Sequence, residues 1–153
     1  ITEVFPDARI VYMARNPEET IPSLLKLMKT GWSMRGWNEQ DMFRSLRILA
    51  EQSYETYTAP LEVIANHKEI RSAIVDYREL VDDTSNTVQK VYAELELPIS
   101  AEFQRILGEE GARSGRHETT HRYSLEEFGL SKDEIHSELE DLFERFQWPR
   151  DPR

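Results

Sequence analysis

The sequence contains no cysteine, and it has no apolar run near the length of a membrane span. Without cysteine, disulfides, thiolate metal sites and cysteine nucleophiles are excluded, and a reducing compartment is favoured. A span needs about 18 apolar residues, and no signal peptide is visible either. We therefore expect a cytoplasmic protein with no membrane span.

Basic residues are also in short supply, with 19 Lys and Arg against 29 Asp and Glu, for a net charge of −10. A general nucleic-acid binder needs clustered basic residues to neutralise phosphates, so this class is excluded. A small anionic ligand remains compatible, because a few aimed donors outweigh a distant negative field. The length of 153 residues predicts one domain, residues 1–153.

Two β-rich apolar runs, Ala8–Ala14 and Ile70–Asp76, are typical of strands buried in a parallel sheet. Helical patterns lie between them, which implies a helical crossover and an α/β fold. Two strands are too few to bury both faces of such a sheet. We therefore expect part of a larger domain, with the remainder upstream of Ile1 or with another chain covering the sheet.

Apolar periodicity places the helices. After an N-cap at Asn16 and a first-turn Pro17, we expect a helix to about Lys29 and a loop at Thr30–Trp37. The same periodicity predicts a helix from Met42 towards Tyr57, a short helix after Pro60, a helix at Val88–Leu95, a short helix at Ala101–Leu107, a loop at Gly108–Thr120, and one final helix that Ser131 and Glu134 cap and that ends near Phe146.

Arg15 stands at the predicted end of the first strand, directly before a helix. Ligands of open α/β sheets gather at this edge, and the free N–H groups of a helix N-terminus suit phosphate. Arg15 adds a planar fork of donors, and Ser23 offers a hydroxyl two turns into the helix. The alternative is an ordinary helix start beside a surface ion pair, and both interpretations stay open on the pattern alone.

Three segments resemble the sulfotransferases that use 3′-phosphoadenosine 5′-phosphosulfate (PAPS). The stretch from Phe5 to Ser23 resembles their 3′-phosphate-binding segment, with Arg and Ser eight residues apart. Asp76–Leu80 resembles their Tyr-Glu-Asp-Leu segment, and 121–130 resembles a C-terminal segment of a bacterial subfamily. The resemblance extends from Phe5 to about Phe146.

The resemblance implies a role for particular residues. Arg15 and Ser23 would bind the 3′-phosphate of PAPS or of its product PAP, and Tyr77 would lie near the adenine. Arg113 and Arg116 stand in the place of the family's basic loop, although they match its Arg-Lys-Gly pattern poorly. The implied fold is a partial P-loop-hydrolase-like α/β fold, a helix-dominated fragment with a small parallel sheet.

The family's 5′-phosphosulfate loop and its usual catalytic base have no counterpart here. None of the six glycines begins a phosphate loop after a strand. Sulfuryl transfer depends on charge stabilisation at the transferred group, so we expect this chain to be inactive alone. The catalytic residue is unknown. The implied acceptor is a small-molecule, carbohydrate or lipid hydroxyl, or an amine, and the implied partner is the missing N-terminal half or a second copy. The alternative is a non-catalytic nucleotide-binding or interaction module.

A competing motif, His-Glu-x-x-His, occupies residues 117–121. On a helix its two His would bind zinc, with Glu118 as general base and with Glu138 or Glu140 as a third ligand. Gly115 and the β-branched Thr119 and Thr120 argue against a helix here. Ser124 and Glu127 predict a capping box after the motif, so a zinc hydrolase is the less favoured alternative and no metal is expected.

Four further expectations concern structure rather than chemistry. Trp32, Met34 and Trp37 either line an acceptor pocket or pack in the core, and core packing is favoured. Acids at 82 and 83 predict an N-cap. We expect His67 and His136 on the surface and a solvated acidic face on the final helix.

Overall fold

The computed structural model describes residues 4–114 and 124–150, with the backbone alone described for 112–114. The chain divides into two compact units. The first comprises residues 1–15 and 60–119, and the second comprises residues 16–59 and 120–153. Each unit is built from segments far apart in the sequence.

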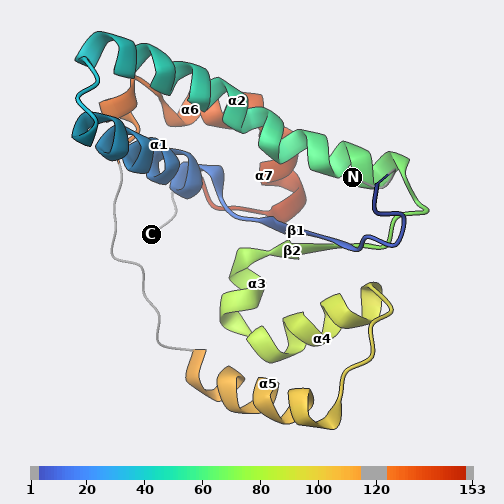
Figure 1. Ribbon diagram of the computed structural model, residues 1–153. Helices are drawn as coiled ribbons and strands as arrows, with labels where there is room; N and C mark the ends of the chain where they lie inside the picture. Colours follow the sequence, from blue (N-terminus) through green and yellow to red (C-terminus); the bar gives the residue numbers. More distant parts are fainter. Residues whose placement is uncertain (1–3, 115–123, 151–153) are drawn as a thin grey trace. The chain divides into compact units, whose positions relative to one another are not determined.

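The first unit contains a two-stranded parallel sheet, which confirms the strand predictions (Figure 1). Strand β1 (Ile10–Ala14) pairs with β2 (Ser72–Asp76) in a register that runs from Ile10 opposite Ser72 to Ala14 opposite Asp76. Both strands begin two residues later than predicted. The Ile10 amide donates to the Arg71 carbonyl at 3.0 Å, and this bond starts the pairing.

Helices complete the first unit: the end of α2 from Pro60, then α3 (Tyr77–Asp82), α4 (Thr84–Glu94) and α5 (Ala101–Ser114). The Asp83 carboxylate accepts from the Asn86 amide at 3.0 Å, which confirms the predicted N-cap. The predicted loop at Gly108–Thr120 is wrong up to Ser114, because α5 continues through both glycines. Gly111 lies so close to α4 that a Cβ there would be 3.3 Å from the Cβ of Ser85.

The two faces of the sheet are covered unequally. Ala73 and Val75 of β2 are buried, whereas their register partners Val11 and Met13 of β1 are 45% and 49% exposed. Partners in a parallel pair point to the same face. That face is therefore covered over β2 and more open over β1.

In the second unit, α1 (Pro17–Met34) begins as predicted. The Asn16 side chain accepts from the Glu18 amide at 2.9 Å, which confirms the N-cap. The predicted loop at Thr30–Trp37 is wrong up to Met34. The helix continues through Thr30 and Gly31, where the Thr30 hydroxyl donates to the Lys26 carbonyl at 2.9 Å, and the chain turns only at Gly36, whose φ is +77°.

Helix α2 (Glu39–Asn66) spans both units and replaces the two helices predicted around Pro60. A proline inside a helix removes one backbone hydrogen bond and strains the preceding turn. Tyr57 and Leu61 lie one helical turn apart, before and after Pro60, and the side chains of both are buried. Their packing supplies the stabilisation that holds the helix continuous.

The C-terminal segment folds onto the second unit as a short 3₁₀ turn (Glu126–Phe128), α6 (Lys132–Glu138) and α7 (Glu140–Phe146). The Ser131 hydroxyl accepts from the Glu134 amide at 3.1 Å, as predicted. The single final helix is wrong, because the chain breaks at the buried Leu139. The capping box at Ser124 is also wrong, because its hydroxyl bonds the Glu126 carboxylate instead.

Aromatic and aliphatic side chains from these segments form the core of the second unit. Trp148 packs edge-on against Tyr57 and Phe143 and stacks on Phe146. Fully buried members also include Ile21, Leu25, Phe128 and Ile135. Across the described residues, none of the helices has both the length and the apolar character needed to cross a membrane.

Candidate functional site

The carboxyl ends of β1 and β2 bring two predicted site residues together in the first unit. Ala14 and Asp76 are the last paired residues, so Arg15 and Tyr77 follow them at the same edge of the sheet. The guanidinium carbon of Arg15 lies 4.5 Å from the centre of the Tyr77 ring, within the range of a cation–π interaction. Both side chains are half-buried, so part of each faces solvent.

Asp76 organises the same edge. Its buried carboxylate caps α3 by accepting from the Arg78 amide at 2.9 Å. The same carboxylate accepts from the Arg78 side chain, with Nη2 at 2.6 Å, and this bond raises the pKa of Arg78. Tyr77 lies between these two residues, as the first residue of α3. The backbone that carries its ring is therefore held from both sides.

We call Arg15, Asp76, Tyr77 and Arg78 the sheet-edge cluster. It offers the planar donor fork of a guanidinium and an aromatic ring beside it. Such a fork matches the geometry of a phosphate, and an aromatic ring suits a base. These residue types fit a phosphorylated nucleoside.

The amide groups at the start of α1, in the second unit, are already engaged. The Glu18 amide donates to the Asn16 side chain, and the Glu19 and Thr20 amides donate to the Asn16 carbonyl at 3.0 and 3.2 Å. The Asn16 side-chain amide in turn donates to the Pro149 carbonyl at 3.1 Å. The expectation of free N–H groups for a phosphate is wrong for these three amides, because each already donates to an oxygen of Asn16.

Glu18 is a buried acid in the first turn of α1. Its carboxylate bonds the His136 imidazole, with the Lys132 Nζ at 3.6 Å, and the Glu18 side chain is 2% exposed. The prediction that His136 lies on the surface is wrong, because α6 packs against α1 and the Phe143 ring meets the imidazole at 4.4 Å. We call Asn16, Glu18, Lys132 and His136 the helix-cap cluster.

The other predicted site residues are placed as follows. Ser23 lies half-buried on α1, in the second unit. Arg113 belongs to α5, but its side chain lies outside the described residues, as does all of Arg116. The whole His-Glu-x-x-His segment, 117–121, is likewise outside them. Within the described ranges, no group of three or more His, Asp and Glu is arranged to hold a metal ion.

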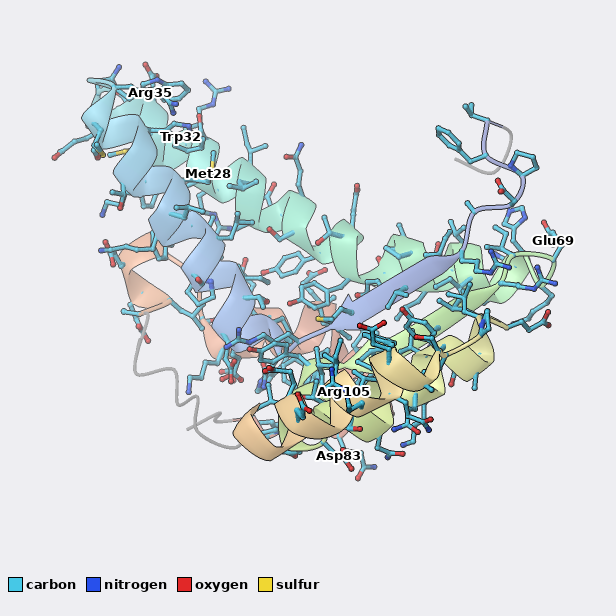
Figure 2. All side chains as sticks on the ribbon, turned by 60° about the horizontal axis from the view of Figure 1, so that its bottom comes forward. Met28, Trp32, Arg35, Glu69, Asp83 and Arg105 are labelled. Atoms are coloured by element: carbon cyan, nitrogen blue, oxygen red, sulfur yellow. The ribbon has the colours of Figure 1, made fainter. Side chains whose placement is uncertain are left out.

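The aromatic residues around the end of α1 lie at the surface. Trp32 and Trp37 stack with ring centres 5.0 Å apart, and Met34 beside them is 83% exposed. Figure 2 shows Trp32 and Arg35 at this end of the helix. The favoured prediction of core packing is therefore wrong for Met34 and Trp37. His67 is exposed as predicted, and it pairs with Glu69.

Sequence reasoning missed the part that Asp76 plays and the part that Glu18 and His136 play. The signal for Asp76 was present, since an acid directly before a helix is a common N-cap. No local signal marks Glu18 and His136, because the contact joins residues 118 positions apart.

Comparison with known families agrees with the resemblance seen in the sequence. The chain matches the model of the family described as "Sulfotransferase family" over residues 1–101, a span that includes the sheet-edge cluster. Searches of curated proteins and of solved structures found no significant match. The match covers about two thirds of the 153 residues. The chain belongs to the sulfotransferase family.

Proposed function

We propose that this chain binds the 3′-phosphoadenosine part of PAPS, for sulfuryl transfer to a hydroxyl or amine acceptor. The observation that carries the proposal is the guanidinium of Arg15 over the Tyr77 ring, at the carboxyl edge of a parallel sheet in a sulfotransferase-family chain. This edge is where ligands of open α/β sheets bind. When bound, PAPS supplies the sulfuryl group.

In the proposed site, Arg15 donates to the 3′-phosphate, and the family resemblance adds the Ser23 hydroxyl as a second donor. Tyr77 lies beside the nucleoside, and Arg113 and Arg116 contribute positive charge from the end of α5 and beyond. The half-buried state of Arg15 supports its role, since a partly desolvated guanidinium binds phosphate more strongly than a fully hydrated one.

We also propose that the 5′-phosphosulfate is held by groups outside this chain, within a larger P-loop-hydrolase-like fold. The sequence has no Gly-, Ser- and Lys-containing loop after a strand, and Val11 and Met13 expose an apolar sheet face that further structure would cover. The 153-residue chain alone is then inactive. A cytoplasmic location stays a prediction from the cysteine-free sequence.

Calorimetry with two nucleotides tests the proposal. We expect the chain to bind 3′,5′-bisphosphoadenosine (PAP) more tightly than 5′-AMP, which lacks the 3′-phosphate. Arg15→Ala should weaken PAP binding about 10- to 100-fold, because a charge-assisted hydrogen bond contributes roughly 1.5–3 kcal/mol. Its effect on 5′-AMP should be small.

Arg105→Ala is the matched control, since Arg105 is an exposed arginine of the same unit that pairs with Glu109. It should leave both affinities unchanged. Equal affinity of the wild-type chain for PAP and 5′-AMP would remove the proposed function. Equal losses from Arg15→Ala and Arg105→Ala would remove Arg15 from the site.

A further inference from the structure

We propose that Tyr77 acts as a positioning residue, whose ring holds the Arg15 guanidinium in place for the 3′-phosphate. This inference rests on the proposed function, and it differs from the adenine contact that the family resemblance implies for Tyr77. It starts from the 4.5 Å between the Arg15 guanidinium carbon and the centre of the Tyr77 ring.

The contact follows from the strand register. Ala14 and Asp76 are paired Cα partners in a parallel ladder, so the chain positions that follow them are neighbours at the same edge. Adjacent strands lie about 4.8 Å apart, so the two side chains start from neighbouring backbone positions. The strand register therefore brings the Arg15 side chain within reach of the Tyr77 ring, and its rotamer completes the contact.

The ring itself is held. Asp76 is buried and caps α3, while its carboxylate also bonds the Arg78 side chain at 2.6 Å. Tyr77 lies between these two fixed residues and is half-buried. A ring on a fixed backbone limits the rotamers open to Arg15, so less side-chain freedom is lost when Arg15 binds a phosphate.

The guanidinium occupies one face of the Tyr77 ring. An adenine therefore has only the other face or the ring edge available for contact. The cation–π interaction acts on the face of the ring and leaves the N–H groups on the edge of the guanidinium able to donate to a phosphate. The two residues then act as one unit, and the unit recognises the phosphate rather than the base.

A double-mutant cycle in the full chain tests this unit by calorimetry. Tyr77→Leu should weaken PAP binding about threefold to tenfold, and Tyr77→Phe, which keeps the ring, should restore most of the loss. In an Arg15→Ala background, Tyr77→Leu should change the affinity for PAP less than about twofold. The affinity for 5′-AMP should be the same in the wild type, in Tyr77→Leu and in Tyr77→Phe.

A Tyr77 that serves the adenine alone would give the opposite pattern. Tyr77→Leu would then weaken PAP and 5′-AMP equally, with the same factor whether or not Arg15 is present, and the inference would be overturned. A wild-type chain with no preference for PAP over 5′-AMP would overturn the proposed function, and the inference with it.

NMR of the nucleotide-free chain distinguishes a failure of the Tyr77 inference from a failure of the proposed function. A guanidinium over a ring face is shielded by the ring current, so the Arg15 side-chain protons should move downfield in Tyr77→Leu and stay nearly unchanged in Tyr77→Phe. Identical Arg15 shifts in the wild type and in Tyr77→Leu would show that the ring does not hold the guanidinium, whatever the nucleotide result.

Discussion

The sheet-edge cluster and the helix-cap cluster each contain a buried carboxylate, and they differ in the basic or aromatic side chains beside it. Each combines basic side chains with one carboxylate, and each stands at the start of a helix. In the sheet-edge cluster, Arg15 is half-buried and stacked on a ring. In the helix-cap cluster, the Glu18 carboxylate is almost fully buried and bonded to His136.

The difference in burial between Glu18 and Arg15 indicates which charged group a ligand can reach. Removing one member of a buried pair leaves the other without its partner, so such a substitution acts mainly on stability. A half-exposed guanidinium can be reached by a ligand from solvent, so its substitution acts mainly on binding. The two clusters should therefore respond to substitution in different observables.

The largest effect is expected at Glu18. Glu18→Ala should lower the free energy of unfolding by about 1–3 kcal/mol, because it leaves the nearly buried His136 imidazole without its hydrogen-bond partner. Denaturant unfolding measures the loss. Glu55→Ala, at an exposed position of α2, is the control and should change the free energy by less than about 0.5 kcal/mol. Equal losses in the two variants would end the distinction between the clusters.

Arg15→Lys tests the sheet-edge cluster, where we expect the effect on nucleotide binding and not on stability. Lysine keeps the charge but loses the planar fork, so we expect PAP binding to weaken about tenfold. The free energy of unfolding should stay within about 1 kcal/mol of the wild type, because the residue is half-exposed. An Arg15→Lys variant that unfolds far more easily than the wild type would mean that Arg15 stabilises the fold instead.

Tyr54 gives a pH-dependent test in the second unit. Burial, aided by the nearby Glu134 and Glu138 carboxylates, raises the pKa of Tyr54 from 10.0 to about 12. The folded state therefore favours the neutral phenol. This contribution is fully present below pH 10 and is lost as the pH rises from 10 to about 12.

Tyr54→Phe should remove that pH dependence. The Tyr54 hydroxyl is buried without a hydrogen-bond partner among the described residues, so at pH 7 the variant should be as stable as the wild type or up to about 1 kcal/mol more stable. Unfolding at pH 7 and at several values between 10 and 12 measures both effects. A difference between the two proteins that is constant across this range would contradict the assigned cause.

The smallest effect is expected at Glu127, which bonds Lys26 at 2.9 Å and Lys29 at 2.8 Å on the surface of the second unit. These bonds lower the pKa of Glu127 from 4.5, so their contribution is present above pH 4.5 and is lost as the pH falls through the lowered value. Glu127→Gln should cost less than about 1 kcal/mol at pH 7 in low salt, and less in high salt. A larger loss that does not depend on salt would mean that Glu127 stabilises the fold as the buried Glu18 does.

Much of the local structure could be predicted because its causes are local. Asn16, Asp83 and Ser131 cap helices with their own side chains, and each cap was expected from a residue type just before an apolar pattern. The two strands were expected from short runs of β-branched and apolar residues. These signals extend over only a few residues, so the sequence displays them directly.

The errors occurred where distant residues decide. Thr30–Met34 and Gly108–Ser114 are helical although their glycines favour loops, and Pro60 lies within a continuous helix. Each helix continues despite a propensity cost of about 1 kcal/mol for glycine, or about 3 for proline, so the tertiary context overrides the local preference. His136 was misplaced for the same reason, since its partner is on α1.

The sequence by itself determined the family, the order of the strands and helices, and the choice of Arg15 and Tyr77 as candidates. Tertiary structure decided what these residues do to each other. The parallel register, built by hydrogen bonds between residues about 60 positions apart, brings the Arg15 guanidinium onto the Tyr77 ring. Burial, which no local pattern encodes, encloses the Glu18–His136 pair and leaves Arg15 and Tyr77 partly exposed to solvent.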